Sequence, residues 1–461
     1  MKQEEMTNIP EDRIPVIVGI GEIVDRPKEI TEGLEPLDLL EQALRRAEAD
    51  AGAMLLGEVQ SLDVVNFLSW RYRDPEKLLA QRLGITPSHC YYGPVGGESP
   101  IRYIHEAAKR IARGECSVAA VCGAEAQSTA TKAERAGAKL PWTPFAHDVE
   151  EPKRGAAFQK PLAVKLGVFR PVTVYPFYEA ASSAHWGQTP REAMAESGTL
   201  WSRYSEAAAQ NPNAWLKRRY APDEITTPTA DNRLIAWPYN KLMVANPSVN
   251  MGGALLLTSL ARARAAGIAE DRLVYPLGGA SAEEPRDYLL RDQFYESHPQ
   301  NAVLKAAVDL AGGDGTAFEA IELYSCFPCV PKMARRTLGL FRRRAADRDR
   351  RPHLLRRAAQ HLHDACGLRD GAAPARWRQA RPALRPGRLR HQASCAGGFE
   401  GAAARGAGAG DERARRGRPQ QARGAEFRRG SLGQGQGREL YGALRPRRGC
   451  RARCGDAAHG R

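Results

Sequence analysis

Residues 341–461 contain no lysine, isoleucine, valine, methionine, threonine or asparagine, although they make up 121 of the 461 residues and hold 30 arginines. Segments that bind nucleic acid usually contain both lysine and arginine, because phosphate contacts depend more on positive charge than on the bidentate geometry of the guanidinium group. Of the 68 basic and 53 acidic residues in the chain, 30 and 10 lie in this segment. The remaining 38 basic and 43 acidic residues make the body mildly acidic, so the formal charge of +15 belongs to the segment.

Five of the six absent residue types, all except valine, are encoded only by codons that begin with A. A GC-rich gene translated out of frame would produce these absences, because its first codon bases would be the wobble bases of the true frame. We therefore expect residues 341–461 to be an out-of-frame, disordered tail with too few large apolar side chains to form a core. The alternative is an arginine-rich tail that binds nucleic acid non-specifically and in a salt-sensitive manner.

Long apolar runs are also absent. No stretch of about 18 apolar residues occurs, and the polar, acidic start MKQEEMTNIPEDR has no apolar signal core. Five of the nine cysteines lie in the body, scattered among apolar segments, which is typical of a reducing compartment. Cys326-x-x-Cys329 is at most half of a zinc or redox site, since no second pair completes it in the body. We expect a cytoplasmic protein with no metal and no membrane span.

The first 126 residues alternate between predicted strands and helices. Apolar runs predict buried strands over 15–21, 62–68 and 117–122, and one-sided apolar spacing predicts helices over 37–51, 75–83 and 99–113. Gly52 and Gly114 stand where the first and last of these helices should end. The alternation predicts an α/β fold with a largely parallel sheet covered on both faces.

The regular pattern is interrupted and then returns. An aromatic-rich stretch follows residue 127, and from residue 245 the sequence again predicts strands (254–257, 273–278 and 318–323) and helices (302–310 and 331–340). We therefore predict four regions: 1–127 as a first α/β half, 128–244 as an inserted loop domain, 245–340 as the end of that half and the start of a second, and 341–461 as the tail.

Three stretches carry a resemblance to the thiolase superfamily: VGGESPIRYIHEAAKRIARGECSVAAVCGAEA (95–126), ANPSVNMGGALLLTSLARARAAG (245–267) and IELYSCFPCVPKMARRTLGL (321–340). The last is similar to the His-Asp-Cys-Phe block of sterol-carrier-type thiolases. SWRYRDP (69–75) and the Gly-Gly-x-Ser-Pro motif also resemble the thiolase-like proteins labelled acetyl-CoA acetyltransferase. The resemblance implies an α/β thiolase fold, with a layered unit that is duplicated around a loop domain and a C-terminal half left incomplete by the tail.

The resemblance places the catalytic nucleophile at the start of the helix over 99–113. A thiolase has a cysteine there, because the helix dipole favours a thiolate and backbone N–H groups steady the acyl oxygen. In this sequence the corresponding residue is Gly97, which cannot form an acyl-enzyme, so the resemblance implies a vacant nucleophile position. Ser99 is either a substitute nucleophile or the N-cap of the helix, and the N-cap is the favoured interpretation.

Further site residues are implied in the later block and in the insertion. Tyr324 stands at the position of the motif's histidine, where it would either polarise a thioester carbonyl or simply pack, and Cys326 matches the motif's cysteine or is a core thiol. Lys217, Arg218 and Arg219 would meet the phosphates of coenzyme A, the alternative being a solvated basic run.

The functional prediction is therefore a thiolase-like acyltransferase that acts on acyl-CoA or acetyl-CoA thioesters in lipid metabolism and lacks the usual cysteine nucleophile. The alternative is a non-catalytic acyl-CoA or lipid-binding protein with the same fold. A coenzyme A thioester is the expected ligand, with no tightly bound cofactor and no specific nucleic-acid partner.

Overall fold

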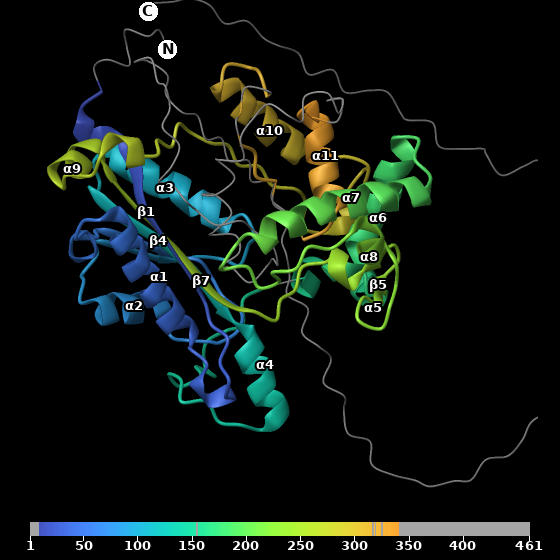
Figure 1. The fold of residues 1–461 in the computed structure, drawn as a ribbon, viewed down its shortest axis with the longest axis horizontal. Helices are drawn as coiled ribbons and strands as arrows, with labels where there is room; N and C mark the ends of the chain where they lie inside the picture. Colours follow the sequence, from blue (N-terminus) through green and yellow to red (C-terminus); the bar gives the residue numbers. More distant parts are fainter. Residues whose placement is uncertain (1–8, 154, 316–317, 319, 324–325, 341–461) are drawn as a thin grey trace, which may run out of the picture. The chain divides into compact units, whose positions relative to one another are not determined.

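A five-stranded sheet forms the centre of the amino-terminal part of the protein in this computed structural model, which describes residues 9–153, 155–315, 318, 320–323 and 326–340 (Figure 1). The strand order is β1-β7-β4-β2-β3. The strands are β1 (Pro15–Val24), β2 (Ser61–Val64), β3 (His89–Tyr92), β4 (Val118–Ala126) and β7 (Asn250–Ser259).

The sheet is mixed, and the prediction of a largely parallel sheet is wrong. β2 runs parallel to both β3 and β4, whereas β7 lies between β1 and β4 and is antiparallel to both. Helical crossovers join β2, β3 and β4, and such connections keep strands parallel. β7 instead follows the long insertion, so the chain can enter the sheet from the opposite end. The predicted strand over 254–257 is confirmed within β7.

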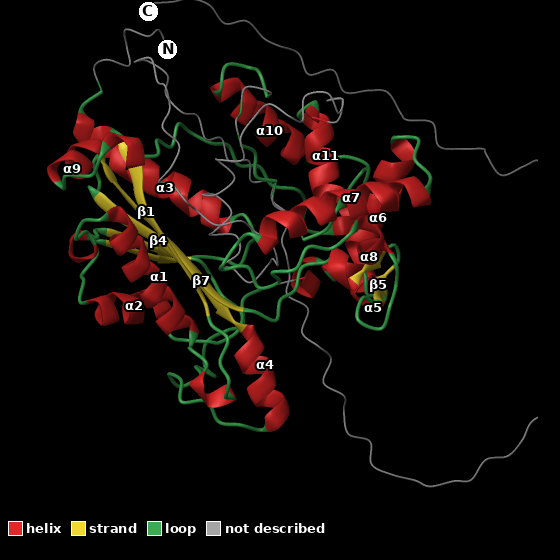
Figure 2. Cartoon of the chain, viewed as in Figure 1, coloured by secondary structure: helices red, strands yellow, loops and turns green. Residues whose placement is uncertain are grey.

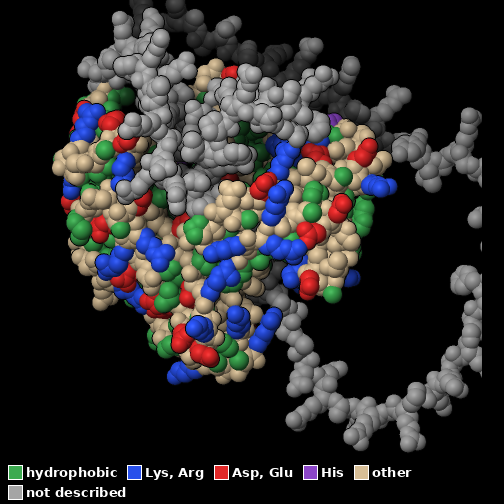
Figure 3. Space-filling view, viewed as in Figure 1, with side chains coloured by type: hydrophobic (Ala, Val, Ile, Leu, Met, Phe, Trp, Pro, Cys, Tyr) green, Lys and Arg blue, Asp and Glu red, His purple; other side chains and the backbone are tan. Residues whose placement is uncertain are grey.

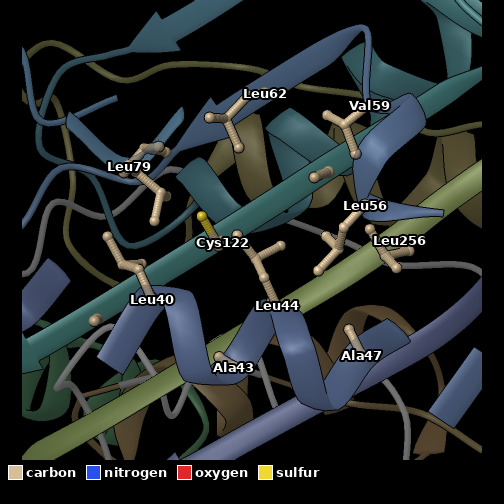
Figure 4. Close-up of a cluster of buried hydrophobic side chains, with 14 of the residues drawn as sticks. Leu40, Ala43, Leu44, Ala47, Leu56, Val59, Leu62, Leu79, Cys122 and Leu256 are labelled. Carbon is tan, nitrogen blue, oxygen red and sulfur yellow. The ribbon is translucent and has the colours of Figure 1, made fainter. Parts of the chain in front are cut away.

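Helices cover both faces of this sheet. α1 (Pro36–Ala51) and α2 (Pro75–Leu83) share one apolar core with the strands, and α3 (Ser99–Arg113) forms a second core on the other face. Figure 4 shows Leu40 and Leu44 of α1 directed toward Cys122 and Leu256 of the strands. β1 passes so close to α1 that a β-carbon at Gly19 would strike the Ala47 carbonyl, which explains the glycine in that strand.

The predicted helices of this part are confirmed, with one correction at a helix start. Gly52 and Gly114 end α1 and α3 with left-handed backbone, at φ 70° and 71°. The N-cap of α3 is Glu98, and Ser99 is the first residue of the helix itself. Because Pro100 has no N–H and fits the first turn, the helix can begin one residue earlier than the serine pattern predicts.

The stretch between β4 and β7 is mainly helical (Figure 2). Its apolar cluster contains fully buried Tyr178 and Tyr239, together with Phe327 from the later block. The elements are α4 (Gln127–Ala136), α5 (Pro161–Lys165), α6 (Pro171–His185), α7 (Pro190–Ala209), α8 (Pro222–Thr226), β5 (Leu234–Ala236) and β6 (Tyr239–Asn240). The short 3-10 helices of the described chain are Glu11–Arg13, Ile30–Glu32, Leu56–Glu58, Gly155–Phe158, Lys241–Met243, Glu270–Arg272 and Tyr288–Leu290.

After β7 the helices appear as predicted but the strands do not. α9 (Leu260–Ala265) is followed by α10 (His298–Leu310) and α11 (Cys329–Thr337), which confirm the two later helices. Of residues 273–278, Val274 forms one isolated bridge to Ile17, and no strand occurs at 318 or 320–323. A strand requires backbone partners along its length, and within 273–278 only Val274 and Pro276 form isolated bridges.

The described residues include no helix long and apolar enough to cross a membrane. Within the same residues, no group of three or more His, Cys, Asp or Glu side chains is arranged to hold a metal ion. The visible face in Figure 3 carries basic and acidic side chains interspersed rather than a field of one sign. Residues 341–461, to which the predictions of frame and disorder apply, lie outside the described part.

Candidate functional site

The start of α3 lies at the carboxyl ends of the parallel strands β2, β3 and β4. The chain leaves β3 at Tyr92, passes through 93–97 and enters the helix at Ser99. Asn66, just beyond β2, donates from Nδ2 to the Gly93 carbonyl at 2.8 Å and accepts at Oδ1 from the Tyr92 hydroxyl at 3.0 Å. In open α/β sheets, ligands bind at this end of the strands, so 93–98 is the candidate site segment.

Glu125, near the end of β4, fixes the loop beside this segment. Its Oε1 accepts from the Leu68 N–H at 2.7 Å, and its Oε2 accepts from the Ser69 N–H at 2.9 Å. The Ser69 hydroxyl accepts in turn from the Ala126 N–H at 2.9 Å. These bonds satisfy a buried carboxylate and hold the chain rigidly as it leaves β2.

The SWRYRDP stretch continues from this loop and has a structural role. Trp70 donates from Nε1 to the Thr143 carbonyl at 2.9 Å, and its ring meets Trp142 edge-on at a centroid distance of 4.9 Å. Tyr72 donates to buried Glu35 at 2.8 Å. The stretch therefore holds the start of α1 and residues 142–143 next to the loop at 68–69 that Glu125 binds.

Gly97 is buried in the segment that leads into α3, at the place where the resemblance puts the nucleophile. Glycine has no side chain, so this position offers no nucleophilic atom. The cysteines in the sheet and next to it do not replace this missing atom. Burial raises the pKa of Cys90 and of Cys116, and Cys122 is fully buried, so these thiols are poor thiolates.

Cys326 is partly buried at the edge of the apolar cluster around Tyr175 and Phe327. Its carbonyl accepts from the Ala245 N–H at 3.2 Å, so the 321–340 block is joined to the 245–267 block that also carries the resemblance. Phe327 stacks on Tyr175 at a centroid distance of 4.2 Å. Cys329 is fully buried, and burial raises the pKa of its thiol far above the usual range. Tyr324 lies outside the described residues.

Lys217, Arg218 and Arg219 are exposed on the loop after α7. Arg218 pairs with Glu224, and Arg219 lies 3.7 Å from Glu206. The side chains of both arginines are more than 60% exposed, so these pairs are weak and a phosphate group can replace them.

The loop of these basic residues is joined to the sheet. Arg26, which follows β1, donates to the Ala214 carbonyl at 3.3 Å, and its guanidinium carbon lies 4.3 Å from the centroid of the Trp215 ring. The three basic residues directly follow this contact in the chain.

Sequence reasoning missed Glu98 of the candidate segment, and Asn66 and Glu125 beside it. No local spacing connects these three residues. A signal was nevertheless present for two of them, because Asn66 lies in the second half of the predicted strand over 62–68 and Glu125 follows the predicted strand over 117–122 by three residues. The carboxyl ends of parallel strands meet at one edge, so these residues could have been grouped from the strand pattern.

No protein-family model matches the sequence, and no curated protein is significantly similar to it. Solved structures are similar. A monomeric SCP2-thiolase-like protein type 1 from Mycobacterium smegmatis is 26% identical with a TM-score of 0.59, and the alignment covers 71% of this chain and 64% of that protein. The chain thus spans less than two thirds of that protein's length.

Two further solved structures are more distant. The Ltp2-ChsH2(DUF35) aldolase is 19% identical with a TM-score of 0.55, over 72% of this chain and 78% of that one. Human mitochondrial 3-ketoacyl-CoA thiolase in complex with CoA is 14% identical with a TM-score of 0.47, over 71% and 83%. The predicted fold class is confirmed: the described chain has a thiolase-like α/β fold.

Proposed function

We propose that this protein binds a coenzyme A thioester at the start of α3 and that any reaction there proceeds without a cysteine acyl-enzyme. The observation that carries the proposal is Gly97, a buried glycine at the entry to a helix that begins at the carboxyl ends of three parallel strands in a thiolase-like fold. The site lies at the carboxyl ends of the strands, where ligands bind in such sheets, but Gly97 supplies no sulfur atom to attack a thioester.

The backbone around Gly97 supports recognition of the acyl group. The start of α3 is the positive end of the helix dipole, which stabilises negative charge on a thioester carbonyl oxygen. In this proposal Lys217, Arg218 and Arg219 meet the phosphates, because they are exposed and weakly paired. Lysine binds phosphate as a point charge, and the arginines can bind it in bidentate fashion.

Such a site can serve an acyltransferase or a carrier, and these two functions differ in whether the bound thioester reacts. A thiolase-like acyltransferase of the acetyl-CoA acetyltransferase type would pass the acyl group directly to an acceptor in the cytoplasm, as a step of lipid metabolism. A carrier would hold the same thioester unchanged. The missing thiol favours the carrier, and the fold favours the transferase.

Aldol-type cleavage is a second candidate reaction on the same ligand, favoured by the glycine at position 97. Cleaving a β-hydroxyacyl thioester requires a base for the hydroxyl proton and stabilisation of the enolate that forms at the thioester, but no thiol. The Ltp2-ChsH2(DUF35) protein, whose fold this chain shares, is an aldolase.

Titration calorimetry with acetyl-CoA tests the proposal. We expect saturable binding by the full chain, and about a tenfold loss of affinity when Lys217, Arg218 and Arg219 are all replaced by alanine, corresponding to about 1.4 kcal/mol. Arg45→Ala, which removes an exposed arginine on α1, is the control and should leave binding unchanged. Absence of binding by the unmodified chain would refute the proposal, and unchanged binding by the triple variant would refute the assigned phosphate contacts.

A further inference from the structure

The carboxyl group of Glu98 turns back over the glycines that precede α3. A β-carbon built on Gly96 would lie 2.5 Å from Oε1 and 2.7 Å from Oε2 of Glu98, so the carboxyl lies against the backbone of the candidate segment. Oε2 is buried and has no hydrogen-bond partner in the part of the chain that the structure describes. Buried carboxylate oxygens almost always have a donor, so this one is available to a ligand.

The electrostatic surroundings of Glu98 favour the protonated acid. Burial is the largest influence and raises its pKa above the ordinary value for glutamic acid, although its own N–H, Arg102 and Arg286 act in the opposite direction. Glu283 raises the pKa further, and it lies 3.8 Å from Arg102, whose charge it partly offsets. A carboxyl of this kind is a stronger base when ionised than an exposed glutamate.

A second buried polar group faces the same segment. Tyr103, on α3, is 3% exposed, and its hydroxyl lies against Gly93 near Ser99. The Glu98 carboxyl and the Tyr103 hydroxyl thus lie against different residues of the candidate segment, Gly96 and Gly93. The unpaired Oε2 of Glu98 leaves a hydrogen-bonding position there for a polar ligand or water.

We propose that Glu98 is the acid–base residue of this site and takes the α-proton from the acyl group of a bound coenzyme A thioester. This assignment depends on the function proposed above. The Cα–H bond breaks, Oε2 accepts the proton, and the bonding electrons move onto the thioester oxygen to give an enolate. The positive end of the α3 helix dipole stabilises that oxygen. Returning the proton to Cα restores the thioester, so the step needs no acceptor, thiol or cofactor.

Hydrogen exchange at the acyl group tests this assignment. The full chain is incubated with acetyl-CoA in D2O, and deuterium in the acetyl methyl group is measured by mass spectrometry, while binding is measured by calorimetry. We expect exchange catalysed by the protein, a loss of at least 100-fold in Glu98→Gln, and binding retained within about threefold, since general base catalysis contributes about 10²–10⁴. The exchange rate should rise with pH through the raised pKa and then level off, a dependence that Glu98→Gln abolishes.

The controls separate a catalytic role from a structural one. Glu106→Gln lies on the same helix, replaces an exposed glutamate paired with Lys109, and should exchange as the unmodified protein does. Glu98→Asp keeps a carboxylate and should restore part of the exchange even if Glu98→Gln folds poorly. Binding without exchange, or equal exchange in Glu98→Gln, overturns the assignment alone. Failure of the unmodified chain to bind acetyl-CoA overturns both this assignment and the proposed function.

Discussion

The two parts of the molecule that carry the resemblance are stabilised in different ways. Around β7 and β4 the chain builds a sheet with helices on both faces and apolar cores beneath them. α11 packs on α6, where its apolar residues Val330 and Met333 join the cluster of the helices between β4 and β7, but it also buries a charged side chain. Lys332 of α11 is completely buried and bonds to Glu179 of α6, to the Ser197 hydroxyl at 3.0 Å and to the Ala193 carbonyl at 3.3 Å.

Among the described elements, α11 makes its main contacts with the helices α6 and α10. An apolar face gives stabilisation without directional constraint, whereas a buried ion pair is stable only if every partner remains in place. Arg336 adds a second pair, donating to both oxygens of Glu196 at 3.0 and 2.9 Å. α11 is therefore held to α6 and α7 by specific polar contacts in addition to apolar packing, whereas α1 meets the sheet mainly through apolar packing.

The largest expected effect comes from removing Lys332, the buried cation of α11. Lys332→Ala leaves the Glu179 carboxylate buried without its cation, so we expect a loss of about 3–5 kcal/mol in the free energy of unfolding of this part. Urea denaturation monitored by hydrogen exchange in α11 measures it. The double variant Lys332→Met with Glu179→Gln keeps an acceptor for the Tyr239 hydroxyl, now 2.9 Å from Oε2 of Glu179, and should recover most of the loss. A double variant as unstable as the single one would contradict this explanation.

A substitution that creates a cavity in the apolar core between α1 and the sheet is the matching test for the sheet. Leu44 of α1 is fully buried, and Leu44→Ala should cost about 2–5 kcal/mol, since the surrounding core relaxes only in part. Hydrogen exchange should then increase through β4 and β7 while α11 keeps its protection. Equal loss of protection in both parts would mean that they unfold as one unit.

The smallest expected effect is the acid sensitivity of the Glu196–Arg336 pair, on the order of 1 kcal/mol. Burial alone would raise the pKa of Glu196, but hydrogen bonds from Arg336 and Gln188 outweigh it and place the pKa below its ordinary value of 4.5. The native carboxylate therefore contributes stability that is complete above pH 4.5 and disappears as the pH falls through the lowered pKa.

Glu196→Gln should remove that acid-side dependence from α11 while leaving a neutral hydrogen bond to Arg336. Thermal melts between pH 3 and pH 6 compare the variant with the unmodified chain. Glu134→Gln, at an exposed position of α4, is the matched control. Identical pH slopes for Glu196→Gln and the unmodified chain would show that the pair contributes nothing.

The sequence could predict the elements whose burial follows from local apolar spacing, but not those that depend on distant partners. Apolar spacing and glycine stops located α1, α2 and α3, because their burial follows directly from local pattern. The direction of β7 was missed, since local pattern does not record from which end a strand enters a sheet. The strands over 273–278 and 318–323 were wrong for a related reason: apolar residues favour burial, but a strand also needs a partner.

For the candidate site too, the sequence identified one residue and missed another. Gly97 was singled out by resemblance, and the structure places it at the start of α3; its role as a vacant nucleophile position stays a prediction. Glu98 was not singled out, because an isolated glutamate before a helix is ordinarily a solvated charge. The buried state of its carboxyl depends on how 93–97 folds against the strand ends, which no sequence pattern reports.

Restoring the thiol at position 97 tests the central claim most directly. Iodoacetamide labelling of the full-length Gly97→Cys variant, followed by peptide mass spectrometry, compares the new thiol with Cys90 and Cys122. The helix dipole should lower the pKa of a thiol at this position, whereas burial raises that of Cys90. We expect the introduced thiol to be alkylated at least about tenfold faster than either native cysteine, and acetyl-CoA to protect it. Equal, slow alkylation at all three positions, unaffected by acetyl-CoA, would contradict it.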